Sequence, residues 1–182
     1  MLLQMKLRGP TVLEIFGLTR TDISIGIVME YSEFNLFEYL HDQKILLNWK
    51  SKIEITLQIA KAIEYIQGKG YIRANLRSTC IYMVPFQDGL IAKISDFSFA
   101  TEDTKVNVHP SKNLPFHLPI WLPPELLKQG KWDKSIDTYS FGVIAYEVYT
   151  RMAFFESVPF VDHIQSLVVS GKRPPLHTLP SP

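Results

Sequence analysis

The segment from Asp137 to Tyr149 constrains the fold most, because it is apolar around its whole circumference when it is drawn as a helix. Such a helix is stable only when other parts of the chain cover it on all sides. The sequence therefore predicts a helix that is fully surrounded by the rest of the protein. The apolar residues around its axis are Phe141, Val143, Ile144, Ala145 and Val148.

A second long helix is predicted from Trp49 to Gln67, where apolar residues recur every three or four positions. Glycines at Gly68 and Gly70 end it, because glycine reaches the positive φ at which helices commonly terminate. Shorter helices are predicted at 36–40 and 160–170. The stripe of the long helix that should face the core consists of Ile53, Leu57, Ala60, Ile63 and Ile66.

Two strand pairs accompany these helices. The β-rich runs Val12–Phe16 and Ile23–Tyr31 are separated by a polar stretch at 17–22, which predicts a hairpin. Residues 81–84 and 90–94 flank a Gln-Asp-Gly turn and predict a second pair. Helices and antiparallel strands in one chain indicate an α+β fold.

Two further segments show no lasting period. Residues 101–119 are polar at first and carry three prolines later, which predicts a mobile loop. Residues 173–182 contain four prolines and should be extended.

Composition limits the functional classes. With 182 residues and 46% hydrophobic content, the chain can bury one core, and its net charge of +1 gives no electrostatic reason to expect nucleic acid or a membrane surface as partner. The one cysteine, Cys80, excludes an internal disulfide and fits a reducing compartment. No run of eighteen apolar residues and no signal peptide are evident, so membrane insertion is not expected and the cytoplasm is the predicted location.

The segment Tyr71–Met83 carries the most specific motif. It reads Tyr-Ile-Arg-Ala-Asn-Leu-Arg-Ser-Thr-Cys-Ile-Tyr-Met. This resembles the protein kinase catalytic loop H-R-D-L-x-x-x-N, in which the Asp accepts the proton of the substrate hydroxyl and the Asn holds a magnesium ion. Here Asn75 stands at the Asp position and Cys80 at the Asn position.

The flanking chain follows the same family order. Lys93–Ser98 resembles the D-F-G magnesium motif with Ser98 in place of Gly, Trp121–Glu125 resembles W-M-A-P-E, and Lys134–Val143 resembles K-S-D-V-W-S-F-G-V. Leu7–Leu13 resembles L-R-H-P-N-I-L, which precedes the last strands of the small kinase lobe. The sequences of these motifs are most similar to those of the tyrosine-kinase-like group, including its mixed-lineage and integrin-linked types.

This resemblance implies a protein-kinase-like fold that is partial within residues 1–182. Residues 1–31 would be a remnant of the small lobe with the hinge strand, and 32–182 the mainly helical large lobe without its last helices. The Gly-rich loop, the ATP-binding lysine and its glutamate partner would lie outside the chain. We therefore expect no cofactor for the chain as written, whereas the family resemblance implies ATP and Mg²⁺.

The resemblance also assigns catalytic and metal positions. Asn75 and Arg77 stand at catalytic positions, but an amide is not a base. Cys80 stands at a cofactor position and is a poor ligand for Mg²⁺, which prefers oxygen. Asp96 is the one acidic group left where a metal could bind. Two interpretations of Asp96 stay open, residual metal or nucleotide contact and a structural role in a turn.

The hinge segment would bind an adenine ring through its backbone, or would be structural alone. Its residues are Met29, Glu30, Tyr31 and Ser32.

Four more positions have implied structural roles. Glu125 would lack the arginine with which the family pairs it. Arg73 replaces the family histidine and would either pair with Asp137 or point into solvent. Ala74 replaces the family arginine that binds a phosphorylated residue of the activation loop. Activation by phosphorylation of that loop is therefore not expected.

Three functional hypotheses follow. The first is a catalytically inactive pseudokinase that acts in signalling as a scaffold or regulator, with a protein partner, possibly another kinase. The second is an ATP-dependent protein kinase in a longer native form. The third is an incomplete fragment without autonomous function. Nucleic acid is not an expected partner in any of them.

Overall fold

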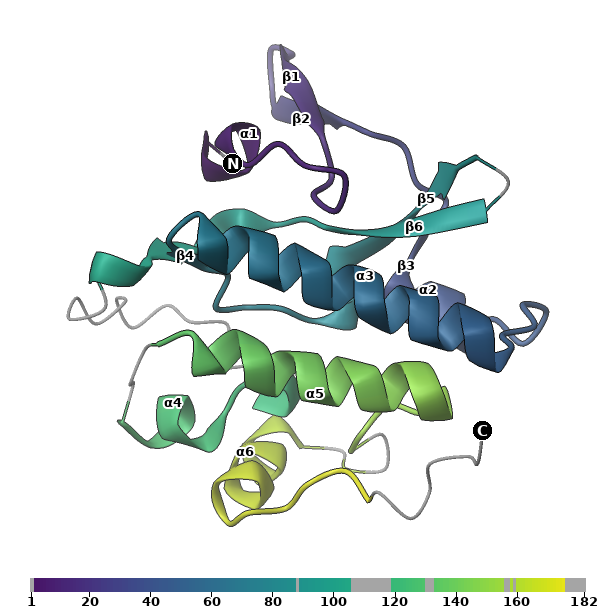
Figure 1. The fold of residues 1–182 in the computed structure, drawn as a ribbon. Helices are drawn as coiled ribbons and strands as arrows, with labels where there is room; N and C mark the ends of the chain where they lie inside the picture. Colours follow the sequence, from purple (N-terminus) through teal and green to yellow (C-terminus); the bar gives the residue numbers. More distant parts are fainter. Residues whose placement is uncertain are drawn as a thin grey trace.

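The computed structural model describes residues 2–87, 89–105, 119–129, 133–155, 158 and 160–175. Figure 1 shows the hairpin at one end, two long helices across the middle and two shorter helices at the other end. In chain order the helices and strands are α1 (Leu2–Lys6), β1 (Ile15–Arg20), β2 (Ile25–Met29), β3 (Phe34–Asn35), α2 (Leu36–His41), α3 (Trp49–Gly68), β4 (Tyr71–Ile72), β5 (Ile81–Phe86), β6 (Gly89–Ile94), β7 (Thr101–Glu102), α4 (Pro124–Gln129), α5 (Ser135–Thr150) and α6 (Val161–Val169). The mixture of helix and antiparallel sheet confirms the α+β class.

The predicted helix α3 is present, but its core stripe differs from the prediction. Asn48 caps its start by accepting a hydrogen bond from the backbone N–H of Ser51, and Gly70, at φ +81, follows its end. Ile53 and Leu57 are 53% and 50% exposed, so placing them in the core was wrong. Two apolar rows run along this helix with the same spacing, and periodicity alone cannot select between them. The residues that are buried are Ile55, Ile59, Ala62, Ile63 and Ile66.

Helix α5 is present and largely enclosed, but it is not buried on all sides as predicted. It packs against α3 on one side and against the 3₁₀ turn Pro119–Trp121 on another. Figure 1 shows α3 between α5 and the strand pair β5–β6. Thr138 and Gly142 mark a narrow exposed row, whereas the enclosed part of the helix also holds polar side chains. Its buried residues are Ile136, Asp137, Ser140, Val143, Ile144, Tyr146, Glu147 and Val148.

The N-terminal hairpin forms, with bounds that differ from the prediction. β1 and β2 pair in antiparallel fashion, and the turn lies at Thr21–Ser24 rather than at 17–22. The Thr21 hydroxyl accepts a hydrogen bond from the backbone N–H of Ser24, which fixes the turn at this point. Val12, predicted in the hairpin, instead makes an isolated parallel bridge to Ile94 and so ties the hairpin base to β6.

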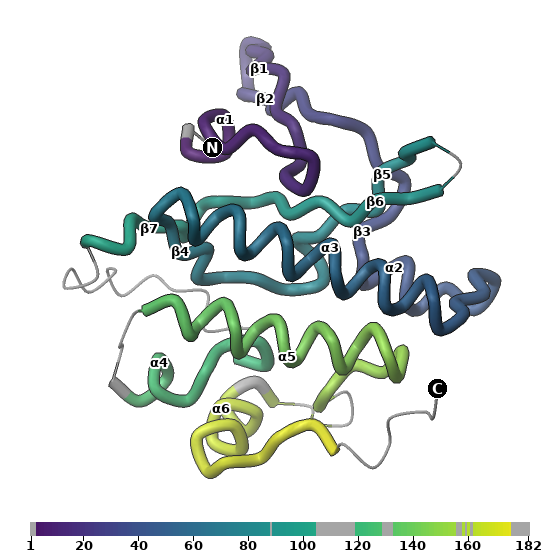
Figure 2. The backbone as a smooth tube through the Cα atoms, in the orientation of Figure 1, coloured from purple at the N-terminus to yellow at the C-terminus, as the bar shows by residue number. Residues whose placement is uncertain are grey.

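Two other small sheets frame the segment between β4 and β5. In the first, β5 pairs with β3 and β6 in the order β3-β5-β6. In the second, β4 pairs with β7. Figure 2 shows β4 and β7 side by side at one end of α3. The segment 73–80 is thus held at both ends by strand pairing.

Two predictions fall partly outside the described residues. The predicted loop includes residues 106–118, and the proline-rich tail includes 176–182. Within the described part of the chain, no helix is both long enough and apolar enough to cross a membrane.

Arg151 links the end of α5 to the end of α2. It follows α5 with a left-handed backbone, at φ 57. Its guanidinium donates to the carbonyl oxygens of Leu40 at 2.7 Å, Ile45 at 2.7 Å and Asp42 at 2.6 Å. One planar fork therefore satisfies three carbonyl groups at and after the C-terminus of α2, a geometry that a lysine cannot match.

We expect Arg151→Ala to lower the free energy of unfolding by about 2 kcal/mol, because three carbonyl groups lose their charged donor. Arg151→Lys should recover little of the lost free energy of unfolding. Urea denaturation measures the change. The control Lys50→Ala removes a side chain that is 84% exposed and should stay within about 0.5 kcal/mol of wild type. Equal midpoints for Arg151→Ala and this control would contradict the structural role.

Candidate functional site

The segment 73–80 is anchored from below by a buried carboxylate on α5. Asp137 accepts hydrogen bonds from the backbone N–H groups of Arg73 and Ala74, both at 2.8 Å. Ala74 has φ 63, a left-handed conformation that is unfavourable for alanine. Burial raises the pKa of Asp137, and the two backbone bonds work against that rise. Asp137 therefore holds a strained turn in place.

Arg73 is fully buried, so the solvent alternative is wrong. Its Nε and Nη2 donate to the carbonyl oxygen of Ser95 at 3.2 and 2.7 Å, and its guanidinium lies over the ring of Phe97. The expected pairing with Asp137 occurs through the backbone N–H of Arg73 rather than through the guanidinium. The sequence shows only that arginine replaces histidine at position 73. It could not show that backbone N–H groups, rather than the guanidinium, bind the Asp137 carboxylate.

Asp96 is enclosed by donors. Arg77 Nη2 lies 3.4 Å from its Oδ2, the Cys80 thiol lies 3.5 Å from the same oxygen, and the Ser98 hydroxyl donates to Oδ1. Burial raises the pKa of Asp96, but the hydrogen bond from Ser98 and the charge of Arg73 outweigh it, so the pKa lies below its ordinary value. Asp96 is thus an ionised carboxylate with both oxygens engaged. Its backbone is left-handed, at φ 57.

Asn75 and Cys80 lie in this same loop and are both buried. The Asn75 Nδ2 has no hydrogen-bond partner among the described residues. Burial raises the pKa of the Cys80 thiol, so sulfur is present as S–H at neutral pH. The structure therefore places Arg77 and Cys80 beside Asp96, with Asn75 in the same loop, and the roles of these residues stay a prediction.

The comparison with known proteins decides the family. A sequence model described as protein tyrosine and serine/threonine kinase matches residues 1–176. The chain belongs to the protein kinase family. Members of this family typically use ATP and Mg²⁺.

Kinases from distant organisms share this similarity. The probable serine/threonine-protein kinase roco9 of Dictyostelium discoideum is 30% identical over 86% of the chain, which covers 5% of that protein. The serine/threonine/tyrosine-protein kinase HT1 of Arabidopsis thaliana is 24% identical over 94% of the chain and 43% of that protein. The human dual specificity testis-specific protein kinase 2 is 25% identical over 81% and 26%. The chain thus spans a small part of the relatives that it matches.

The residues predicted as the hinge of the kinase domain connect β2 to β3. Glu30 accepts from Lys93 Nζ at 2.7 and 2.9 Å, and Ser32 Oγ lies 2.8 Å from the carbonyl oxygens of Phe34 and Met83. Tyr31 is 75% exposed, and Met29, at the end of β2, is partly exposed. Glu30 and Ser32 thus have structural partners, and ligand binding at this segment stays a prediction.

Glu125 lies in the first turn of α4 and is half-buried. Its negative charge acts on the phenol of Tyr139 and contributes to the raised pKa there, after burial, which is the largest cause. The absence of its family partner stays a prediction.

Glu147 is a buried carboxyl group that the sequence reasoning missed. It lies on α5 beneath the loop, near the Ser78 hydroxyl and the Trp121 indole N–H, although none of these groups reaches a hydrogen bond of good geometry. Burial raises its pKa to about 7, against smaller opposing effects of Ser78 and Trp121. The available signal was a single acidic residue within the apolar run of α5.

We expect Glu147→Gln to change how stability depends on pH. Between pH 4.5 and about 7 folded Glu147 keeps a proton that unfolded Glu147 has lost, so wild-type stability falls as the pH rises through this range. The glutamine amide of the variant does not ionise, so the variant does not lose stability from this group as the pH rises. Relative to wild type, the variant should gain up to about 3 kcal/mol at pH 8 and little at pH 4.5.

Denaturant unfolding at the two pH values tests this prediction. Glu64→Gln, on the exposed face of α3, is the matched control and should show the same pH dependence as wild type. A wild-type-like pH profile in Glu147→Gln would mean that Glu147 is not protonated in the folded chain.

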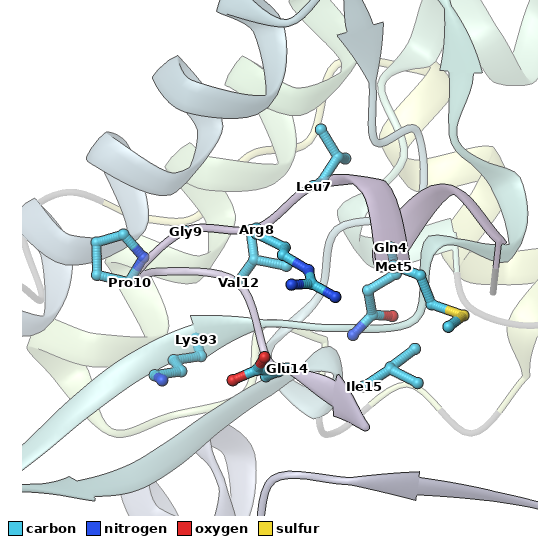
Figure 3. A pocket seen from close by; sticks show the side chains of 10 residues that line it. All are labelled: Gln4, Met5, Leu7, Arg8, Gly9, Pro10, Val12, Glu14, Ile15 and Lys93. Carbon is cyan, nitrogen blue, oxygen red and sulfur yellow. The ribbon is translucent and has the colours of Figure 1, made fainter. Parts of the chain in front are cut away.

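A well-formed cavity lies away from this loop. It measures about 250 Å³ between α1, the start of β1 and β6. Figure 3 shows that most of the residues around it lie on the segment 7–14 between α1 and β1, and the charged residues among them and on β6 are Arg8, Glu14 and Lys93. Lys93 is already paired with Glu30. The cavity is not lined by Asn75, Arg77, Cys80 or Asp96, so the candidate site remains the loop 73–80 with Asp96.

Proposed function

We propose that this chain is a protein-kinase-like domain that no longer transfers phosphate and that acts in signalling through protein contacts. The observation that carries the proposal is the ion pair between Arg77 and Asp96, together with an amide at position 75. We also propose that residues 1–31 correspond to the end of the small lobe and the hinge strand, and 32–182 to the large lobe. Membership of the tyrosine-kinase-like group and a cytoplasmic location belong to the same proposal.

The loop lacks the chemistry of proton removal. The Asn75 side chain can orient a hydroxyl group but cannot accept its proton, and general-base catalysis contributes about 10²- to 10⁴-fold. Asp96 is the carboxylate left at a metal position, and its oxygens already accept hydrogen bonds from Arg77, Cys80 and Ser98. Both changes act against phosphoryl transfer, which depends on positioned charge.

The hairpin supports a role in protein contacts. Two strands stand out from the rest of the chain, as Figure 1 shows, and expose large apolar side chains. Ile23 is 96% exposed, and an apolar patch of this kind on a folded domain marks an interaction surface. We propose a protein partner, possibly another kinase. The exposed residues of this surface are Phe16, Leu18, Ile23, Ile25, Ile27 and Val28.

A phosphotransfer assay with labelled ATP tests the loss of activity. Wild type and Asp96→Ala are compared with Mg²⁺ and with Mn²⁺, on a basic protein substrate and on a tyrosine-containing copolymer. We expect equal, background incorporation for the two proteins. Transfer that depends on metal and disappears in Asp96→Ala would contradict the proposal and favour an ATP-dependent protein kinase.

Unfolding experiments separate the scaffold from a fragment without function. A scaffold should unfold cooperatively as a monodisperse species. A chain that binds a hydrophobic dye and lacks a cooperative transition would favour the fragment.

A further inference from the structure

The hairpin sheet has open edges. It consists of two strands in the order β1-β2, and among the described residues no third strand pairs with either of them. Figure 2 shows the hairpin standing apart from the long helices α3 and α5. A two-stranded hairpin by itself is only marginally stable in water, so a further strand at one of its edges would stabilise it.

Every second residue of β2 turns its backbone groups away from β1. At the turn, the N–H of Thr21 donates to the carbonyl oxygen of Ser24 at 2.9 Å, and at the hairpin base the N–H of Glu30 donates to the carbonyl oxygen of Glu14 at 2.9 Å. Positions that face the partner strand alternate with positions that face away from it along an antiparallel strand, so the even-numbered residues from 24 to 30 face β1. The residues whose N–H and C=O groups point out of the open edge are therefore Ile25, Ile27 and Met29.

The edge of β2 lacks the features with which edge strands usually prevent pairing. Such strands commonly carry lysine, proline or a bulge. β2 reads Ile-Gly-Ile-Val-Met, with no charged residue and no proline. β1 differs, because it has a bulge between Ile15 and Gly17 and ends at Arg20. Of the two edges, the edge of β2 is thus the one suited to accept another strand.

The outward positions of β2 are self-complementary in an antiparallel register centred on Ile27. In this register Ile27 lies opposite Ile27 of a second copy, and Ile25 of each copy lies opposite Met29 of the other. All of these positions point outward, so each of their N–H and C=O groups gains a hydrogen-bond partner. A two-fold axis through the centre of the register relates the two copies, as in most protein dimers.

The same register brings exposed apolar side chains together. Leu18 lies opposite Ile27 within the hairpin, so the central row across the four strands is Leu18, Ile27, Ile27 and Leu18. Further along the register, Ile23 of one copy, which is 96% exposed, reaches the level of Tyr31 of the other, which is 75% exposed. Stable interfaces bury about 800 Å² on each partner. A five-residue strand and its turn offer less, which indicates a dimer that dissociates on dilution.

We propose that a second copy of this chain docks on the open edge of β2, so that two hairpins form one antiparallel sheet in the order β1-β2-β2-β1. The symmetric register favours a second copy over an unrelated strand, because the same five residues supply both halves of the contact. The inference rests on the proposed function and deepens it, since it names the partner of the hairpin surface.

Sedimentation equilibrium of the full chain at several concentrations tests the dimer, and we expect a reversible monomer–dimer equilibrium. Ile27→Pro removes an outward N–H without removing a hydrogen bond to β1, and it should raise the dimer Kd about tenfold or more. Leu18→Pro makes the same change at the outer edge of β1, and as the matched control it should keep most of the affinity. Thermal melts show whether each variant is folded.

Ile27→Lys keeps the test decisive if the proline variant does not fold. It places a charge at the centre of the register on a side chain that is 46% exposed, and it should weaken the dimer in the same way.

Disulfide formation tests the register. Ile27→Cys should cross-link two copies under mild oxidation, because a hydrogen-bonded antiparallel pair places the Cα atoms about 5.5 Å apart, within the range of a disulfide. Val28→Cys is the matched control and should not cross-link, because in this register it lies opposite Gly26 of the second copy. Cys80, which is 3% exposed, is present in both variants and does not distinguish them.

Three results would overturn the inference: a monomer at every concentration, a dimer that the folded Ile27 variants leave intact, or equal cross-linking of the two cysteine variants. None of these experiments measures phosphotransfer. A failure here is therefore distinct from a failure of the proposed function, which the labelled-ATP assay detects.

Discussion

The carboxylate of Asp137 is the constraint on which the site depends. It accepts hydrogen bonds from two backbone N–H groups of a turn in which Ala74 is left-handed, and it does so from the first turn of α5. Removing it would leave two buried donors unpaired and a strained turn unsupported. Because α5 is covered by α3 and by the turn at 119–121, the position of the loop is fixed by the packing of the whole helical layer.

Charge is arranged in two levels around the loop. Asp137 and Glu147 lie beneath it, where burial raises the pKa of each carboxyl group. Arg73, Arg77 and Asp96 form the level above, linked by the Ser95 carbonyl and by the ion pair at 3.4 Å. The catalytic loop of a kinase uses carboxylates to hold a metal and to accept a proton. In this chain the guanidinium groups of Arg73 and Arg77 surround a single carboxylate, Asp96, and an amide, Asn75, stands at the position of the proton acceptor.

The sequence predicted the elements better than their contacts. Helices α3 and α5 and the β5–β6 pair follow from apolar spacing and turn residues, and the motif identified the loop in which Cys80 lies beside Asp96. Spacing could not select between the rows of Ile53 and Ile55, because both have the same period. Nor could it locate the hairpin turn, which a single hydroxyl bond at Thr21 decides, or the partner of Arg73, which is a backbone carbonyl. These contacts depend on segments far apart in the chain.

Cys80 gives the chain a built-in reporter of motion. It is the one cysteine in the sequence, and its side chain is 3% exposed beside Asp96. Burial raises the pKa of its thiol, and only the thiolate reacts with alkylating reagents. Modification must therefore wait for the loop to separate from Asp96 and admit solvent. The rate at which a thiol reagent labels the native protein consequently measures how often the fold opens around Cys80, without any engineered probe.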